Sequence, residues 1–288
     1  MKKKCLGVKR LIKYQTKNVT IFQSVLYKTT SLVIRTEDCI LVVDPNLLPE
    51  EVLEIRRHVD KVKDEKPIYL IFTHSDWDHI VGYGAFQDGT VIAHEAFQTR
   101  EDKEDILSQI LKFDDEYYLD REYPVLFPKV DIPVTEDGQV LEIGKTKLTF
   151  YKAEGHTNDG IFTVVEPIGI WIAGDYLSDV EFPFIYDNSE KYEKTIGKTD
   201  RILGSHIINL LVPGHGTATD IKQEIIFRKV LSYRYIQELR NALNEKVDHH
   251  FLIEGYKYKK DQVKSHEENV ALVRRELEVA SKQIDKAK

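Results

Sequence analysis

The residues best suited to chemistry lie in one short stretch, where four potential metal ligands occur within six positions. This stretch follows an apolar run, 68–72, that predicts a buried strand. The potential ligands are His74, Asp76, Asp78 and His79. Imidazoles and carboxylates spaced this closely can converge on divalent ions, whose positive charge would hold the carboxylates together. The alternative is a turn in which Ser75 or Asp76 accepts hydrogen bonds from the first backbone N–H groups of a helix.

A similar placement recurs at three later points in the chain. Each is a histidine or an aspartate just past an apolar run, next to a glycine that lets backbones approach closely. These residues are His156, Asp175 and His215. A single histidine at a strand end is usually a packing or surface residue, but four such placements together favour metal ligation.

The complete set resembles the metallo-β-lactamase superfamily. The signature of that superfamily is His-x-His-x-Asp-His, followed by a histidine, an aspartate and a histidine at later strand ends. The matching positions, within a resemblance that covers residues 19–220, are His74, Asp76, Asp78, His79, His156, Asp175 and His215. One departure is Asp76, which stands where the signature has a histidine. A carboxylate adds a negative charge and a harder donor, which leaves the identity of the metal open.

The resemblance implies a fold of the α+β class, a four-layer αββα sandwich with the metal site along one edge. Two mixed sheets would lie face to face, with helices outside. We expect a single domain over residues 1–288, with a core of about 19–220 and a helical extension of about 221–288.

The resemblance also implies how the metal ions are held. His74, Asp76 and His156 would bind the first ion, Asp78, His79 and His215 the second, and Asp175 would bridge both. Zinc is the first expectation, with manganese or iron as alternatives. Two ions roughly 3.5–4 Å apart make a bridging hydroxide available at neutral pH. Asp78 is the expected catalytic residue, because it would orient that hydroxide or pass on its proton.

The function implied is a metal-dependent hydrolase that attacks an ester, lactone, thioester or phosphodiester. The alternative is a di-iron oxidoreductase or oxygen-sensing protein of the same fold, since flavo-di-iron relatives also carry a carboxylate at the position of Asp76. A binding module without catalysis is disfavoured because every ligand position is intact.

Composition indicates an ordinary globular protein. The chain has 288 residues, is 42% apolar and 31% charged, and has a formal net charge of −7, which argues against a general nucleic-acid surface. We find no apolar run of signal-peptide or membrane-span length. The cysteines, Cys5 and Cys39, do not suggest a disulfide framework. We therefore expect a cytoplasmic protein that acts on a small molecule without a membrane partner, and a homo-oligomer stays open.

Hydrophobic patterns predict the elements that position the ligands. Strands are expected over 19–26, 31–35, 39–43, 68–72, 91–94, 134–150, 161–165, 169–172 and 207–212. Helices are expected over 49–62, 80–86, 97–111, 200–205, 221–247 and 264–285. The stretch 176–197 is expected to be a loop, and 1–18 an arm or a first edge strand. Asp44 either orients a metal-bound histidine or is a turn residue before a proline.

Residues that contact the substrate are harder to identify. The aromatic, acidic segment 95–133 lies where the superfamily often carries an insertion over the active site; a solvated connection with packed tyrosines is the simpler interpretation. Tyr176 is a candidate donor to a substrate oxygen, with a core tyrosine as the alternative. His266 and Asn269 share one face of the last predicted helix and are candidates to reach the pocket. We interpret His94 as structural. Trp77 is expected to pack beneath the ligand loop, with a place in the pocket lining as the alternative.

Overall fold

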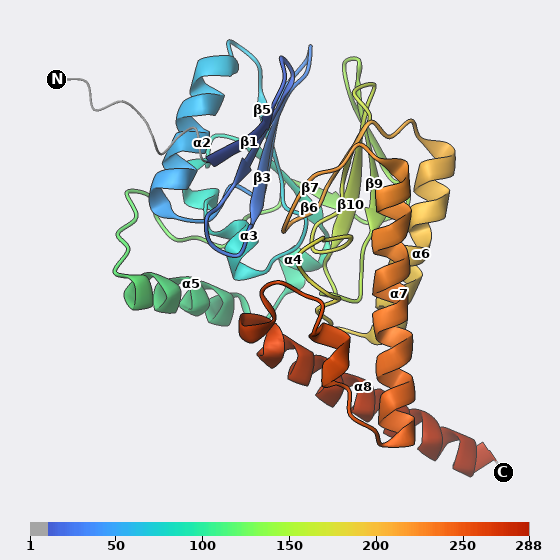
Figure 1. The fold of residues 1–288 in the computed structure, drawn as a ribbon. Helices are drawn as coiled ribbons and strands as arrows, with labels where there is room; N and C mark the ends of the chain where they lie inside the picture. The colour runs from blue at the N-terminus through green and yellow to red at the C-terminus, as the bar shows by residue number, and fades with distance from the viewer. Residues whose placement is uncertain (1–10, 288) are drawn as a thin grey trace.

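Two β-sheets packed face to face, with helices on both outer sides, form the body of the computed structural model, which describes residues 11–287 (Figure 1). Cys5 lies outside this range, and Cys39 is a buried free thiol. The layers confirm the predicted αββα sandwich. The predicted division into a core and an extension stays a prediction.

The first sheet has seven strands in chain order, which are β1 (Ile12–Gln15), β2 (Val19–Gln23), β3 (Thr30–Arg35), β4 (Ile40–Val43), β5 (Ile68–Ile71), β6 (Thr90–His94) and β7 (Ile132–Val134). Neighbours from β1 to β4 are antiparallel, and those from β4 to β7 are parallel. The edge position of β1 confirms the second of the two alternatives for residues 11–18, and residues 1–10 lie outside the described range.

The second sheet has five strands in the order β12-β11-β10-β9-β8. They are β8 (Val140–Ile143), β9 (Thr146–Lys152), β10 (Ile161–Glu166), β11 (Ile170–Ile172) and β12 (Leu210–Val212). Its β11–β12 pair is parallel and the other pairs are antiparallel. Both sheets are therefore mixed, as expected.

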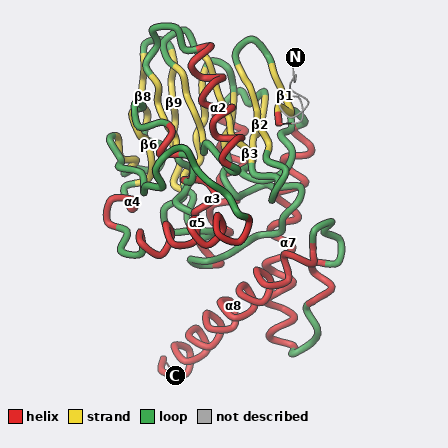
Figure 2. The backbone as a smooth tube through the Cα atoms, turned by 90° about the vertical axis from the view of Figure 1, so that its left-hand side faces the viewer, coloured by secondary structure: helices red, strands yellow, loops and turns green. Residues whose placement is uncertain are grey.

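Helices cover the outer face of each sheet. On the side of the first sheet lie α2 (Pro49–Val62), α3 (Trp77–Ile80), the 3₁₀ turn η1 (Tyr83–Ala85), α4 (Ala96–Thr99) and α5 (Lys103–Tyr117). On the side of the second lie α6 (Ser189–Ser205), α7 (Lys222–Glu245), the 3₁₀ turn η2 (His250–Ile253) and α8 (Lys259–Ala287). Figure 2 shows α7 and α8 projecting below the sheets, and α8 crosses their lower edge in Figure 1. No helix among the described residues is long and apolar enough to cross a membrane.

The core has three apolar layers, because most strands are buried on both faces. Successive side chains of a strand point to opposite faces, so Leu41 and Val43 of β4 pack between the sheets, while Ile40 and Val42 pack toward α2. A third layer lies between the second sheet and helices α6 to α8. Burial on both faces explains why these strands form continuous apolar runs in the sequence.

The predicted helix over 80–86 is wrong. The chain forms only the single turn α3 and then η1. A Cβ atom on Gly82 would lie 2.0 Å from the carbonyl oxygen of Pro45, and one on Gly84 1.8 Å from that of Pro124. Two neighbouring loops therefore press on the backbone here, and glycine also disfavours a helix interior.

Two other boundaries differ from the prediction. Helix α6 begins at Ser189, inside the stretch expected to be a loop, and the Asn188 side chain caps it by accepting a hydrogen bond from the backbone N–H of Lys191 at 2.9 Å. The helix expected over 97–111 is split into α4 and α5, because Arg100 turns inward between them to reach the buried Asp159.

Candidate metal centre

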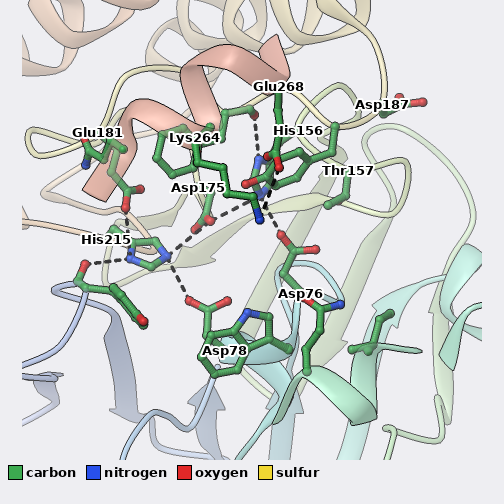
Figure 3. Close-up of a pocket in the computed structure, with 18 of the residues that line it drawn as sticks. Asp76, Asp78, His156, Thr157, Asp175, Glu181, Asp187, His215, Lys264 and Glu268 are labelled. Atoms are coloured by element: carbon green, nitrogen blue, oxygen red, sulfur yellow. Dashed lines mark hydrogen bonds and ion pairs between the residues drawn. The ribbon is translucent and has the colours of Figure 1, made fainter. Parts of the chain in front are cut away.

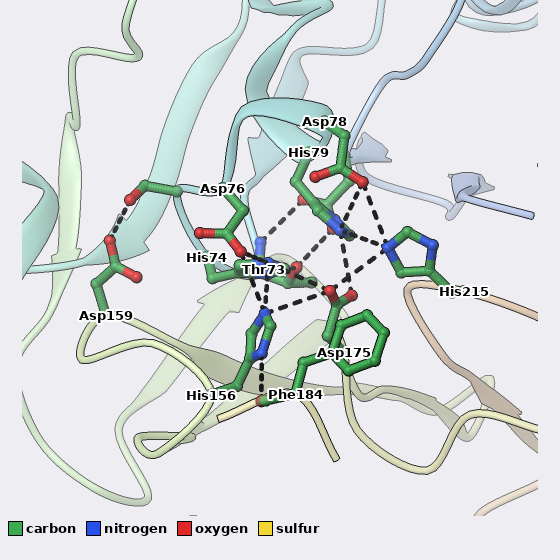
Figure 4. Close-up of polar contacts among 12 residues, drawn as sticks. Thr73, His74, Asp76, Asp78, His79, His156, Asp159, Asp175, Phe184 and His215 are labelled. Atoms are coloured by element: carbon green, nitrogen blue, oxygen red, sulfur yellow. Dashed lines mark hydrogen bonds and ion pairs between the residues drawn. The ribbon is translucent and has the colours of Figure 1, made fainter. Parts of the chain in front are cut away.

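All seven predicted ligands lie together at one edge of the sandwich, where strands of both sheets end (Figure 4). The turn after β5 supplies four of them, and the turns after β9, β11 and β12 supply one each. In chain order they are His74, Asp76, Asp78, His79, His156, Asp175 and His215. Each sheet therefore contributes part of the site.

The first group consists of His74, Asp76 and His156. The Nε2 atoms of the two histidines are 3.3 Å apart. Oδ2 of Asp76 lies 3.6 Å from Nε2 of His74 and 3.3 Å from Nε2 of His156. Oδ2 of Asp175 completes the group at 3.6 Å and 3.3 Å from the same two nitrogens.

The second group consists of Asp78, His79 and His215. The Nε2 atoms of the histidines are 3.3 Å apart. Oδ2 of Asp78 lies 3.8 Å from Nε2 of His79 and 3.4 Å from that of His215. Asp175 also reaches this group, with Oδ1 3.1 Å from His79 and Oδ2 3.4 Å from His215.

These spacings fit bound metal ions. Metal–ligand bonds of about 2.0–2.2 Å place neighbouring ligand atoms about 3.3–3.6 Å apart around a four-coordinate ion. The distances in the first group lie in that interval, and those in the second group lie close to it. Oδ1 of Asp175 is also fully buried, and although it lies 3.1 Å from Nε2 of His79 it makes no hydrogen bond. A buried carboxylate oxygen without a hydrogen bond is costly, and a cation between the two groups would satisfy it.

The charges of the centre also indicate bound metal cations. Burial would lower the pKa of His156, but the carboxylates of Asp175 and Asp76 outweigh burial and raise it to about 10. Burial likewise opposes ionisation of Asp175, yet the pKa of this carboxyl is held well below its usual value by His79, His215 and other imidazoles. The carboxylates therefore require positive charge inside the centre. Metal cations supply that charge when the imidazoles are neutral ligands.

Neighbouring groups fix the orientation of three imidazoles. Nδ1 of His79 lies 2.9 Å from Oδ2 of Asp44. Nδ1 of His156 lies 2.8 Å from the carbonyl oxygen of Phe184, and Nδ1 of His215 lies 2.9 Å from that of Tyr27. Each contact leaves Nε2 directed into the centre, which is how ligating histidines are usually held. Of the two alternatives for Asp44, the structure supports orientation of a histidine.

Two glycines let the turns meet at the centre. A Cβ atom on Gly214 would lie 2.1 Å from Oδ1 of Asp175, and one on Gly174 would lie 3.2 Å from Cβ of Thr73. Gly174 also has a φ of +49°, which other residues adopt rarely. The glycines that drew attention in the sequence therefore allow close approach at these two ligand positions.

A cavity of about 1300 Å³ opens over the centre. Its walls come from the loop before β3, from segment 96–117, from the loop after β11 and from α8. Figure 3 shows Lys264 and Glu268 of α8 directed into this cavity above Asp76 and Asp175. The helical C-terminal segment is therefore part of the pocket wall.

Glu181 is a site residue that sequence reasoning missed. Its Oε1 lies 3.5 Å from Nδ1 of His215, and with Asp175 it forms a further group able to hold an ion. Burial is the main cause that raises the pKa of Glu181 to about 7, against the opposing charge of His215. The available signal was an acidic residue in the apolar stretch 180–185, where a charged side chain needs a partner.

The three candidates for substrate contact lie behind the pocket wall. Tyr176 is buried, and its hydroxyl accepts a hydrogen bond from the N–H of His156 and contacts the carbonyl oxygen of Glu154 at 2.8 Å. Asn269 is buried and accepts from the N–H of Ile185 at 2.8 Å. His266 is buried on the same face of α8 as Asn269, and none of the three lines the large cavity. These residues support the site from behind.

Segment 96–117 does form a wall of the cavity. Arg100 contacts Asp159 at 2.9 Å, and Asp159 is fully buried. Trp77 both lines the cavity and packs on Phe113 of α5, with ring centroids 4.8 Å apart. Packing beneath the loop and lining the pocket are therefore both true of Trp77. His94 is structural as predicted, with Nδ1 accepting from the N–H of Ala96.

Comparison with known proteins gives consistent results. A family model described as the metallo-beta-lactamase superfamily matches residues 26–236. A type 2 metallo-beta-lactamase of Bacillus sp. (strain 170) is 26% identical over 198 residues, which is 67% of this chain and 68% of the relative.

Solved structures share the fold. An inverting sec-alkylsulfatase from Pseudomonas sp. matches with a TM-score of 0.64 and 11% identity over 81% of this chain. The match spans only 42% of that enzyme, so the chain corresponds to less than half of it. A protein from Thermus thermophilus, described as a metallo-beta-lactamase family protein, matches with a TM-score of 0.57 and 18% identity over 79% of this chain and 83% of its own.

Proposed function

The chain belongs to the metallo-β-lactamase superfamily and is an enzyme with a histidine–aspartate metal-binding cluster, and we propose that it is a hydrolase with two divalent metal ions. The proposed substrates are small molecules with an ester, lactone, thioester or phosphodiester bond. Zinc is the proposed metal, with manganese and iron as the alternatives.

The observation that carries this proposal is the position of Asp175. Its two carboxylate oxygens lie within 3.1–3.6 Å of the Nε2 atoms of His74, His79, His156 and His215. One carboxylate shared by two groups of ligands suits a pair of adjacent metal ions. We therefore assign His74, Asp76 and His156 to one ion, Asp78, His79 and His215 to the other, and Asp175 to both.

Two ions held in this way supply a nucleophilic water at neutral pH and polarise the bond under attack. The protein's own residues would do the rest. Asp44 and the carbonyl of Phe184 keep the imidazoles of His79 and His156 oriented. Asp78 lines the cavity, and we assign to its carboxylate the role of accepting the proton that the attack releases. The walls from α5 and α8 would keep bulk water away from the substrate.

The bond that is cleaved is to be identified with a panel of substrates. The relatives are named for different substrates, a β-lactamase in one case and a sec-alkylsulfatase in another. A first substrate panel should therefore include a β-lactam and a secondary alkyl sulfate beside lactones, thioesters and phosphodiesters. The net charge of −7 supports a small-molecule substrate rather than a nucleic acid. We propose a cytoplasmic location, which cell fractionation would test.

The experiment that tests the proposal is elemental analysis of protein purified without added metal or chelator, combined with a visible spectrum. Two zinc or manganese ions in the centre, no colour and turnover of one panel substrate are the expected result. Turnover that persists after chelation and metal removal would contradict the proposal.

A second candidate is a di-iron oxidoreductase or oxygen sensor. It is favoured by Asp76, whose hard carboxylate oxygen lies in the first ligand group. Two irons with an absorption band that changes on exposure to oxygen would place this candidate first.

A further inference from the structure

A second group of histidines lies outside the metal centre, where the turn after α7 meets α8. Nδ1 of His249 lies 3.0 Å from Nε2 of His266. One ligand atom each from His249, His266 and Glu267 falls within 4.8 Å of the others. His250 approaches the same point, with Nε2 3.1 Å from Oε1 of Glu267. Two imidazoles and a carboxylate thus converge from two separate segments of the chain.

His266 has the surroundings of a metal ligand. It is fully buried, and its Nδ1 lies 2.8 Å from the hydroxyl of Tyr235. Asn269 donates to the same hydroxyl at 2.9 Å, so the tyrosine is held in place. Because Nδ1 is engaged, Nε2 is the nitrogen directed toward His249. A ligating histidine is commonly oriented in this way through its other ring nitrogen.

We propose that His249, His266 and Glu267 bind a third ion per chain, a single zinc ion that clamps α8 to the turn after α7. Two imidazoles and one carboxylate suit zinc, which prefers nitrogen and oxygen ligands at about 2.0–2.2 Å. His250 acts as a positioning residue, because it contacts Glu267 on one side and Asp248 at 2.9 Å on the other.

A zinc ion at His249, His266 and Glu267 would affect the catalytic pocket through α8, which forms part of the pocket wall. Lys264, Ser265 and Glu268 flank His266 on this helix and line the cavity over the metal centre. Figure 3 shows Lys264 and Glu268 of this wall. Ordering the helix at His266 therefore orders one wall of the pocket.

A chain of hydrogen bonds connects the clamp to the metal centre. Asn269 accepts from the N–H of Ile185 at 2.8 Å and donates to the carbonyl oxygen of Pro183. The carbonyl of Phe184, between those two residues, contacts Nδ1 of His156. An ion at His266 would thus stabilise the loop that orients a predicted ligand of the first ion.

The test is zinc titration of the chelator-stripped full-length protein by calorimetry, with metal content measured after dialysis. We expect three zinc ions per wild-type chain. His249→Gln and Glu267→Gln should each retain two, with the third site weakened at least about tenfold. His58→Gln is the matched control, because His58 lies in neither ligand group, and it should retain three. Wild-type protein that binds only two ions, or a third ion kept by both variants, overturns the proposal.

Asp175→Ala separates this site from the catalytic one. If the clamp exists, this variant still binds one zinc ion through His249, whether or not the proposed hydrolase function is correct. Loss of all zinc from Asp175→Ala, with the fold intact by circular dichroism, would contradict a separate site.

Hydrogen exchange tests the clamping itself. The third equivalent of zinc should slow amide exchange over residues 259–270 by about tenfold in wild-type protein and leave it unchanged in His249→Gln. Equal exchange with and without the third ion in wild-type protein overturns the clamp.

Discussion

The carboxylate of Asp44 joins His79 to Thr73, at the start of the turn that carries the ligands. Its Oδ2 lies 2.9 Å from Nδ1 of His79, and the same carboxylate accepts hydrogen bonds from the N–H and the hydroxyl of Thr73 at 2.9 Å and 2.6 Å. Asp44 has a left-handed φ of +41°. A buried aspartate thus sets the direction of a ligand although it does not reach the centre.

We expect Asp44→Asn to weaken metal binding by about 10–100-fold while the fold is kept. Asparagine tolerates a positive φ, but its amide cannot act as a charged acceptor for both His79 and Thr73. Metal affinity measured by competition with a chromophoric chelator checks this. Asp64→Asn is the control, since Asp64 is exposed and pairs with Arg35 away from the centre. Equal affinities in the two variants would remove Asp44 from the ligand support.

Asp175→Ala should lose both ions of the centre together, and with them at least about a thousandfold in activity. The reason is that both ligand groups share this carboxylate. Elemental analysis and turnover, measured on the same sample, provide the readout. Asp187→Ala changes another pocket carboxylate that belongs to neither group, and it should keep both ions. Full occupancy in Asp175→Ala would refute the bridging assignment.

Asp76→His should shift metal preference toward zinc by about tenfold over manganese or iron. Replacing a hard carboxylate with neutral imidazole removes a negative charge and favours a borderline metal. Competition between zinc and manganese at equal concentration measures the ratio. The matched substitution Asp187→His should leave it unchanged. An unaltered ratio in Asp76→His would show that other residues determine the metal.

Arg100→Ala should destabilise the protein by about 3 kcal/mol, because it leaves the fully buried carboxylate of Asp159 without its cation. Urea unfolding gives the free energy of unfolding. Arg234→Ala removes an exposed pair with Glu238 and should change stability far less than Arg100→Ala does. A similar small loss in Arg100→Ala would mean that Asp159 is satisfied by other groups, such as Ser75.

The contribution of His266 to the stability of the metal-free protein should fall as pH falls from about 6.5 to about 4. Burial, and then the neighbouring His249, lower the pKa of His266 to about 4. In that interval the unfolded chain binds a proton that the folded chain does not, which costs up to about 3 kcal/mol near pH 4. Above pH 6.5 the contribution is constant. Urea unfolding at several pH values checks this, and His266→Gln should lack this part of the pH dependence.

That the proposed ligands lie together could be predicted from sequence because each follows an apolar strand directly. The end of a strand determines the position of the residues that follow it. When the two sheets pack face to face, the turns after β5, β9, β11 and β12 therefore lie at the same edge. The residues around the ligands were harder to predict from the sequence. Glu181 reaches His215 only through the folded path of the loop after β11, and no local pattern records that path.

The choice between alternatives also needed tertiary contacts. Periodicity placed His266 and Asn269 correctly on one helix face, but it did not say which neighbour that face meets. The face packs on Tyr235 and on the loop around Phe184 instead of facing the cavity. The first part of helix α6 was missed because threonines at buried positions, such as Thr195 and Thr199, obscure its apolar period.

Because the ligands come from both sheets, metal binding also affects the resistance of the protein to unfolding and proteolysis. Four ligands follow a strand of the first sheet and three follow strands of the second. Bound ions would therefore hold the two sheets together. A ligand present at 100 times its dissociation constant adds about 2.7 kcal/mol to folding stability. Loss of metal should therefore do more than abolish activity. Without the ions, the two sheets would separate transiently more often, and the chain would be more exposed to proteases.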